Sequence, residues 1–188
     1  MEQNPPAKPG TSHPDIRIEL ITEKHDLSCF SCSEQELNDF LTTDALTDHT
    51  SLYSTTRLVY YNGTLAGFFT LIADNISVTS IPPENYMDYH YQKLPAVKIA
   101  RLAVDKKFER QGIGKRIITE IFRIVYQVSQ QIGCRVITVD AKENALGFYK
   151  KFTFMEVKSK KNLDYIPMYL DFRTLMMKGQ SAERFSSQ

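Results

Sequence analysis

Two glycines that follow an apolar segment are the residues of this chain best suited to binding an anion. Residues 99–104 (IARLAV) predict a buried strand, and residues 111–115 (QGIGK) open a long segment of helical apolar periodicity. Glycines at a helix start let successive backbone N–H groups turn toward one concavity, where the positive end of the helix dipole adds its attraction. The arrangement predicts a pyrophosphate-binding turn.

The spacing of these glycines does not match the two best-known nucleotide-binding turns. A dinucleotide turn needs G-x-G-x-x-G, and position 117 is Ile. The turn also lacks the G-x-x-x-x-G-K-[ST] pattern of nucleoside-triphosphate loops. A single Gly-x-Gly is weak evidence by itself, so the flanking residues must identify the ligand.

Two blocks of the sequence carry a resemblance to a known family. LAVDKKFERQGIGK resembles the acetyl-CoA signature of the GNAT acetyltransferase superfamily, a strand followed by [Arg/Gln]-x-x-Gly-x-[Gly/Ala] and a helix. Downstream, VITVDAKENALGFYKKFTF resembles the second block of the superfamily, with Ala-x-x-Phe-Tyr on a short helix before a final aromatic strand. The resemblance implies the α/β GNAT fold, a twisted, mixed and mostly antiparallel central sheet flanked by helices.

The resemblance implies where acetyl-CoA would bind. In the family, amides of the glycine loop hold the pyrophosphate, and the end of the preceding strand pairs with the pantetheine arm. Glu109 departs from the signature, which has Arg or Gln there, and Lys142 stands where many relatives have Asn. The residues expected to bind the cofactor are Leu102, Ala103, Val104, Glu109, Arg110, Gln111, Gly112, Ile113, Gly114, Lys115, Lys142, Asn144 and Phe148.

The resemblance also implies a catalytic role for Tyr149. In GNAT enzymes the Tyr of the Ala-x-x-Phe-Tyr block gives a proton to the departing thiolate, and a phenol with an ordinary pKa of about 10 is protonated at neutral pH. A backbone N–H of residues 102–104 is expected to stabilise the carbonyl oxygen. The alternative is that Tyr149 only packs against the cofactor.

The predicted central strand offers no general base. Residues 96–104 contain Lys98 and Arg101, which are both cations at neutral pH. A lysine ε-amine with a pKa of about 10.4 is neutral in about one molecule in a few thousand at pH 7, whereas an α-amine near pKa 8 is neutral in roughly a tenth. A site without a base therefore favours an α-amine acceptor.

A closer resemblance agrees with such an acceptor. FSCSEQELNDFL, GFFTLIADNISV, RLAVD and DAKENALGFYKKF are similar to segments of the GNAT-type toxins of toxin–antitoxin pairs, over about residues 16–172. Those toxins acetylate the α-amine of aminoacylated tRNA, so the resemblance implies tRNA and an antitoxin protein as partners. In those toxins a basic surface beside the cofactor binds RNA, and the candidates here are Lys93, Lys98, Arg101, Lys106, Lys107 and Arg110.

Two other functions stay open. The acceptor could be a small amine or a protein amine instead of charged tRNA. The chain could also be a catalytically silent acetyl-CoA-binding module, which Glu109, Lys142 and the missing base would support.

Composition and charge fit one globular domain. The chain has 188 residues, of which 42% are hydrophobic and 24% charged. Residues 1–92 hold 4 Lys and Arg against 13 Asp and Glu, whereas residues 93–188 hold 19 against 9, so a polyanion would be drawn to the second half. No apolar run reaches membrane-spanning length and the start lacks a secretion signal, so we expect a cytoplasmic protein. Three cysteines and four scattered histidines predict no metal site.

The resemblance implies one GNAT domain over residues 15–177, and we expect a disordered tail at 1–14 and a second tail at 178–188. Asn62-Gly63 predicts a tight hairpin, and Ser33 with Glu36 predicts a capping box at a helix start. A free sheet edge would allow a homodimer. The strands are expected at 16–21, 57–61, 64–72, 96–104, 135–140, 154–157 and 165–172, the later helices at 111–132 and 144–151, and a loop at 75–94.

Overall fold

The computed structural model describes residues 15–81, 91–157 and 164–176. The expected tails at 1–14 and 178–188 lie outside these ranges. The strands are β1 (Ile16–Leu20), β2 (Thr55–Tyr61), β3 (Thr64–Ser77), β4 (Lys93–Val104), β5 (Val136–Ala141), β6 (Met155–Glu156) and β7 (Ile166–Asp171). The α-helices are α1 (Gln35–Thr43), α2 (Ala45–Thr50), α3 (Ile113–Ser129) and α4 (Leu146–Lys150), with short 3-10 turns at Val78–Ser80, Lys106–Phe108 and Glu143–Ala145.

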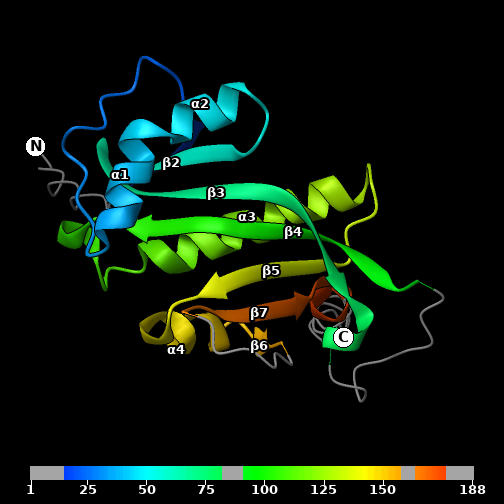
Figure 1. Ribbon diagram of the computed structural model, residues 1–188. Coiled ribbons are helices and arrows are strands. Elements are labelled where there is room, and N and C mark those ends of the chain that lie inside the picture. Colours follow the sequence, from blue (N-terminus) through cyan, green and yellow to red (C-terminus); the bar gives the residue numbers. More distant parts are fainter. Residues whose placement is uncertain (1–14, 82–90, 158–163, 177–188) are drawn as a thin grey trace, which may run out of the picture.

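The strands form one seven-stranded sheet, and the helices pack against it (Figure 1). Its strand order is β1-β2-β3-β4-β5-β7-β6, in which β4 and β5 pair in parallel and the other neighbours pair antiparallel. The predicted mixed, mostly antiparallel sheet is confirmed. Within the described residues, no helix has the length and apolar character needed to cross a membrane.

The two faces of the sheet bury separate cores because side chains alternate along each strand. On β3, Phe68 packs with Phe40 and Leu41 of α1, whereas its neighbour Phe69 packs with the isoleucines of α3. Helices α1 and α2 therefore cover one face, and α3 covers the other, where Tyr149 of α4 joins the same core. The predicted cofactor turn and the predicted acid thus belong to elements of one face.

The predicted β2–β3 hairpin is confirmed. Asn62 has φ 49° and Gly63 has φ 79°, and positive φ at both central residues is the signature of the type I′ turn. This turn suits Asn-Gly because its twist matches that of the flanking strands. The hairpin pairs β2 with β3, and β3 pairs on its other edge with the long central strand β4.

The predicted loop over residues 75–94 is wrong at both ends. β3 continues to Ser77 and β4 begins at Lys93, and these two residues pair in the antiparallel ladder. Ile76 and Leu94 are buried in a separate small cluster, which explains why β3 and β4 stay paired over these residues. Pro95 lies within β4, where its carbonyl accepts a hydrogen bond from Arg135 N.

The helical predictions were right in kind and less accurate in extent. α3 ends at Ser129 instead of residue 132, and Ile132, expected on its apolar stripe, is 68% exposed. The helix expected after Ser33 is broken at Asp44 into α1 and α2. Phe40, Leu41 and Ala45 are buried, whereas Leu37 is half-buried.

Candidate active site

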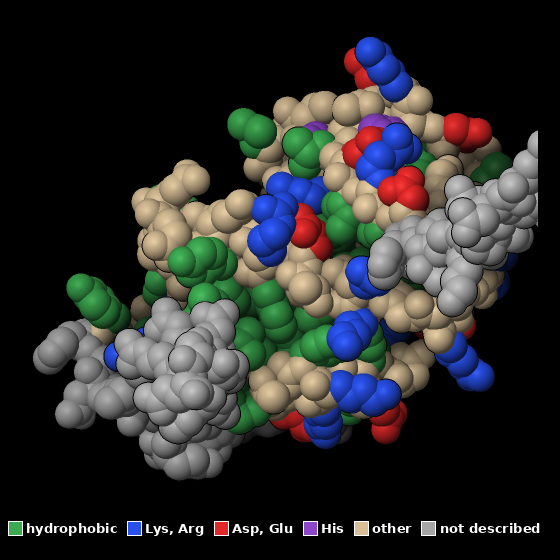
Figure 2. Space-filling view, turned by 180° about the vertical axis from the view of Figure 1, so that it is seen from behind, with side chains coloured by type: hydrophobic (Ala, Val, Ile, Leu, Met, Phe, Trp, Pro, Cys, Tyr) green, Lys and Arg blue, Asp and Glu red, His purple; other side chains and the backbone are tan. Residues whose placement is uncertain are grey.

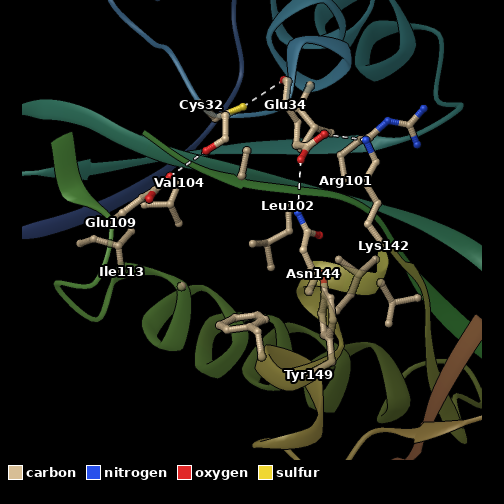
Figure 3. Close-up of a pocket in the computed structure, with 18 of the residues that line it drawn as sticks. Cys32, Glu34, Arg101, Leu102, Val104, Glu109, Ile113, Lys142, Asn144 and Tyr149 are labelled. Atoms are coloured by element: carbon tan, nitrogen blue, oxygen red, sulfur yellow. Dashed lines mark hydrogen bonds and ion pairs between the residues drawn. The ribbon is translucent and has the colours of Figure 1, made fainter. Parts of the chain in front are cut away.

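A cavity of about 1220 Å³ opens where β4 and β5 separate. The two strands pair from Ala96 opposite Val136 to Ile99 opposite Val139, but β4 continues to Val104. Residues 100–104 therefore bond to β3 on one side and line the cavity on the other. Figure 3 shows Leu102 and Val104 on one side of this space and Tyr149 on the other.

The strand register shows which main-chain groups point into the cavity. Asp105 N donates to Ala66 O at 2.9 Å, which continues the antiparallel ladder between β4 and β3. Hydrogen-bonded positions alternate in such a ladder, so Ala103 faces β3, whereas the N–H and C=O groups of Leu102 and Val104 point away from it. These groups are available to pair with an amide-bearing ligand or to stabilise a carbonyl oxygen.

The turn after β4 presents free N–H groups at the other end of the cavity. Gly112, with φ 84°, precedes α3 in the left-handed conformation that glycine favours, and Arg110 also has a positive φ of 59°. The first bond inside the helix runs from Arg116 N to Gly112 O at 3.1 Å. The N–H groups of residues 113–115 therefore have no intrahelical acceptor, which is what the predicted pyrophosphate turn requires.

Gly114 serves a second purpose that the sequence did not indicate. A Cβ built at this position would lie 3.0 Å from Cε2 of Phe148 and 3.2 Å from its Cζ. The glycine therefore allows the start of α3 to approach α4 closely. The predicted pyrophosphate turn and the helix that carries Tyr149 are in this way held against each other.

Tyr149 is buried beside the cavity among aromatic rings. Its ring makes edge contacts with Phe148 and Phe154, at centroid distances of 5.1 and 5.5 Å, and only 6% of the residue is exposed. Burial raises the pKa of its phenol above the ordinary value, so the hydroxyl stays protonated. The position and protonation state fit a proton donor.

A loop from the first half of the chain forms the opposite wall. Asp105, which is 1% exposed, accepts hydrogen bonds from Lys107 N and Ser31 N, each at 2.8 Å, and Lys106 N donates to Ser31 O at 3.0 Å. These bonds connect the segment before α1 to the start of the turn that follows β4. They bring Cys32, Ser33, Glu34 and Glu36 to the cavity.

The predicted capping box at Ser33 is wrong because its hydroxyl has another partner. Ser33 Oγ donates to Glu109 Oε1 at 3.0 Å, and α1 starts after Glu34 without any side-chain cap. Sequence reasoning did not identify Glu34 and Glu36 as cavity residues, and it assigned Glu36 to the capping box with Ser33. No other signal in this one sequence pointed to them.

Glu34 instead joins the two halves of the chain across the cavity. Its Oε2 accepts a hydrogen bond from Lys142 Nζ at 2.7 Å, and its Oε1 accepts one from Asn144 Nδ2 at 3.5 Å (Figure 3). The ammonium lowers the pKa of Glu34, and the carboxylate raises the pKa of Lys142. Both groups are therefore charged at neutral pH.

The two basic side chains of the central strand, those of Lys98 and Arg101, have different kinds of partner. Lys98 pairs with Asp140 at 2.5 Å. Arg101 donates from Nη1 to Ala100 O at 2.9 Å and lies 5.1 Å from the ring centroid of Phe40, with no carboxylate partner among the described residues. Strand β4 therefore contributes no carboxylate or imidazole that could serve as a base.

The structure gathers nearly all of the predicted site residues around one space. Tyr149 and every predicted cofactor residue line the cavity except Gln111, whose side chain donates to Lys107 O at 2.8 Å. The glycine turn and the Ala-x-x-Phe-Tyr helix, about 35 residues apart, meet as the two blocks require. Cys29, Cys32 and Cys134 are free, and no set of three or more metal-binding side chains gathers within the described ranges.

Comparison with known families identifies the fold built around this cavity. The model of the acetyltransferase (GNAT) domain matches residues 30–172, which is most of the chain. The protein belongs to the GNAT acetyltransferase family. The glycine turn, the separated strands and Tyr149 of this GNAT enzyme all lie within the matched residues.

Relatives of this GNAT acetyltransferase include toxins. It is 28% identical over 160 residues to a tRNA-acetylating toxin of Mycobacterium tuberculosis, covering 83% of this chain and 93% of that protein. The structure of AtaT complexed with acetyl-methionyl-tRNAfMet matches with a TM-score of 0.78 and 24% identity, covering 87% of this chain and 98% of that one. AtaTR bound with acetyl-CoA matches with a TM-score of 0.73 and 25% identity, over 87% and 97%.

Proposed function

We propose that this GNAT acetyltransferase transfers the acetyl group of acetyl-CoA to the α-amine of aminoacyl-tRNA. The observation that carries the proposal is that every carboxylate lining the described cavity already has a partner. Glu34 and Glu36 lie beside Lys142, Asp140 pairs with Lys98, and Glu109 accepts from Ser33.

When every carboxylate of a site is already paired, none is free to act as a general base. Such a site favours an acceptor amine that is often neutral without a base. An α-amine is neutral in roughly a tenth of molecules at pH 7, several hundred times more often than a lysine ε-amine. The names of the relatives agree with this choice, since one is a tRNA-acetylating toxin and AtaT was solved with acetyl-methionyl-tRNA.

The residues of the cavity fit the cosubstrate along its length. The free N–H groups of residues 113–115 would hold the diphosphate, with Arg110 and Lys115 nearby on the cavity wall. The outward main-chain groups of Val104 would pair with the pantetheine amides. Acetyl-CoA supplies the thioester that the acceptor amine attacks.

Two groups of the chain would then assist the transfer. The N–H of Leu102 lies on the cavity side of β4, where it would stabilise the negative charge on the carbonyl oxygen. Tyr149 would donate its phenolic proton to the departing sulfur, and its buried, protonated state makes it able to do so.

Cations near the cavity support an RNA-bearing acceptor. Arg101, Arg110, Lys115 and Lys151 line the cavity, and no carboxylate among the described residues pairs with them. On the face seen in Figure 2, Lys and Arg side chains alternate with acidic ones instead of forming one basic block. RNA would therefore be gripped at a limited number of positions close to the active site.

An antitoxin protein would be the cellular partner of such an enzyme. AtaT, which shares the fold, was solved with the C-terminus of the antitoxin AtaR. We include this partner in the proposal on the strength of that likeness.

In the decisive experiment, the purified protein is incubated with labelled acetyl-CoA and each of a panel of acceptors. Charged tRNAs should gain the label, whereas deacylated tRNA, polyamines and lysine-containing peptides should gain little. Label on a peptide ε-amine or a polyamine, with none on charged tRNA, would replace the proposal with the small-amine or protein-amine alternative. Absence of thiol release with every acceptor would favour the silent binding module.

A further inference from the structure

A lysine amine lies inside the cavity proposed to receive the acceptor amine. Lys142 directly follows β5, and its Nζ lies 2.7 Å from Glu34 Oε2 and 3.6 Å from Glu36 Oε2. Figure 3 shows the contact with Glu34 above Asn144, on the same side of the cavity as Arg101. The cavity is continuous from this group to Leu102 and Tyr149.

The location of Lys142 follows from the separation of the two central strands. β4 and β5 stop pairing at Ile99 and Val139, and Lys142 lies three residues beyond that point on the β5 side. Leu102 lies three residues beyond it on the β4 side. The lysine therefore borders the same gap into which the outward N–H of Leu102 points.

The enzyme thus faces two primary amines, its own and that of the acceptor. Only an unprotonated amine has the lone pair that attacks a thioester. The carboxylate of Glu34, by its hydrogen bond and charge, raises the pKa of Lys142, and Glu36 adds to this effect. The pair therefore keeps the ε-amine in its unreactive, charged form.

We propose that Lys142 is an internal acetyl acceptor, and that Glu34 suppresses this self-acetylation by holding the amine as an ion pair. The proposal rests on acetyl-CoA binding in this cavity, as the proposed function does. It does not depend on which external acceptor the enzyme uses.

The self-acetylation step is a simple acyl transfer. Nζ of Lys142 first loses a proton to solvent and then attacks the thioester carbonyl carbon, so that an N–C bond forms and the C–S bond breaks. The sulfur leaves with the electron pair and takes up a proton from Tyr149, which regains one as the new amide nitrogen loses its second proton. The products are N-acetylated Lys142 and the free thiol.

Acetylation would also change the wall of the cavity. The amide has no positive charge, so it cannot maintain the ion pairs with Glu34 and Glu36. Glu34 would keep its 3.5 Å contact with Asn144, and the connection between the start of α1 and the segment after β5 would weaken. A self-acetylated enzyme should therefore handle its external acceptor less well.

The test compares Glu34→Gln with the wild-type protein. Each purified protein is incubated with acetyl-CoA and no acceptor, and acetylation of every lysine is measured over time by peptide mass spectrometry. Loss of a half-exposed ion-pair partner should raise the neutral fraction of Lys142, and hence its acetylation rate, about two- to fivefold. Adding Tyr149→Phe to Glu34→Gln should remove most of the gain in the acetylation rate of Lys142, because transfer within the active site needs the acid. Uncatalysed acetylation from solution needs no such acid and would not be affected.

A matched control is available on the surface. Lys150 pairs with Glu156 at the same 2.7 Å, but Lys150 does not line the cavity. Glu156→Gln should raise acetylation of Lys150 only to the rate of other exposed lysines. In Glu34→Gln, Lys142 should be acetylated clearly faster than Lys150.

The opposite results are equally definite. If Lys142 in Glu34→Gln reacts no faster than Lys150, the proposal is wrong. It is wrong too if folded Glu34→Gln no longer binds acetyl-CoA, because Glu34 then serves the cofactor. Should that variant fail to fold, Glu36→Gln replaces it, with a smaller rise supporting the proposal and no rise overturning it. Failure to acetylate charged tRNA would end the proposed function without affecting these measurements.

Discussion

Tyr149 shows how one residue gains its chemistry from its surroundings. Its phenol is enclosed by Phe148 and Phe154, and this burial raises its pKa. An acid that stays protonated throughout the physiological range can always donate to the departing thiolate. The sequence motif predicts the role of this residue, and the packing explains why its hydroxyl stays protonated.

Replacing Tyr149 by Phe tests the proton-donor role directly. The ring contacts remain, so acetyl-CoA affinity should stay within about twofold of wild type, while kcat falls roughly 100- to 1,000-fold because the acid is lost. Calorimetric binding and thiol-release kinetics measure the two quantities. Unchanged kcat would show that Tyr149 only packs against the cofactor.

The buried phenol also predicts a pH dependence of stability. The pKa of Tyr149 is raised in the folded state. The contribution of the buried, protonated phenol to the free energy of unfolding is therefore fully present below about pH 10. This contribution is lost as the pH rises further, because the unfolded chain releases the proton at a lower pH than the folded protein does. Urea unfolding of wild type and Tyr149→Phe should therefore give free energies of unfolding whose difference is constant up to about pH 10. Above about pH 10, the free energy of unfolding of wild type should fall by up to about 1.4 kcal/mol per pH unit more than that of the variant. Parallel curves throughout would contradict the burial argument.

At the scale of elements, the glycine turn and α4 form one unit. Gly112 provides the left-handed conformation before α3, and Gly114 provides the close approach to Phe148. The sequence predicted the turn because glycine spacing is local information. It could not predict the Phe148 contact, since that depends on where α4 packs.

Gly114→Ala should disturb this unit. The new Cβ would press on the Phe148 ring at 3.0 Å, which should cost about 1–3 kcal/mol of unfolding free energy and weaken acetyl-CoA binding. Gly147→Ala is the matched control, because nothing lies within 4 Å of its Cβ and alanine favours a helix. Thermal unfolding and cofactor titration of both variants provide the comparison. Equal behaviour of the two would exclude a tight α3–α4 contact.

At the scale of the whole molecule, sequence reasoning succeeded where the information was local and failed where it was not. The family blocks, the Asn62-Gly63 hairpin and the helix stripe of α3 were found because they repeat known short patterns. The Glu34 to Lys142 contact spans 108 residues and crosses the cavity, so nothing in either segment indicated it. The capping-box error at Ser33 has the same origin, because Glu109 is a distant partner.

The distribution of charge leads to a prediction about RNA binding. If the enzyme contacts three to five phosphates near the cavity, its affinity for charged tRNA should fall about 30- to 500-fold between roughly 50 and 200 mM salt. Lys151→Gln, at a lysine of the cavity wall with no carboxylate partner among the described residues, should reduce the slope of log affinity against log salt by about one. Lys150→Gln, at a lysine already paired with Glu156, should leave it unchanged. Salt-independent binding would argue against an RNA acceptor.

The central claim is that the gap between β4 and β5 aligns acetyl-CoA between the turn before α3 and Tyr149. A crystal structure of the protein with acetyl-CoA measures this most directly. The account predicts diphosphate oxygens about 3 Å from the N–H groups of residues 113–115, and the thioester between Leu102 N and the Tyr149 hydroxyl. A cofactor bound elsewhere, or with its thioester directed away from Tyr149, would contradict it.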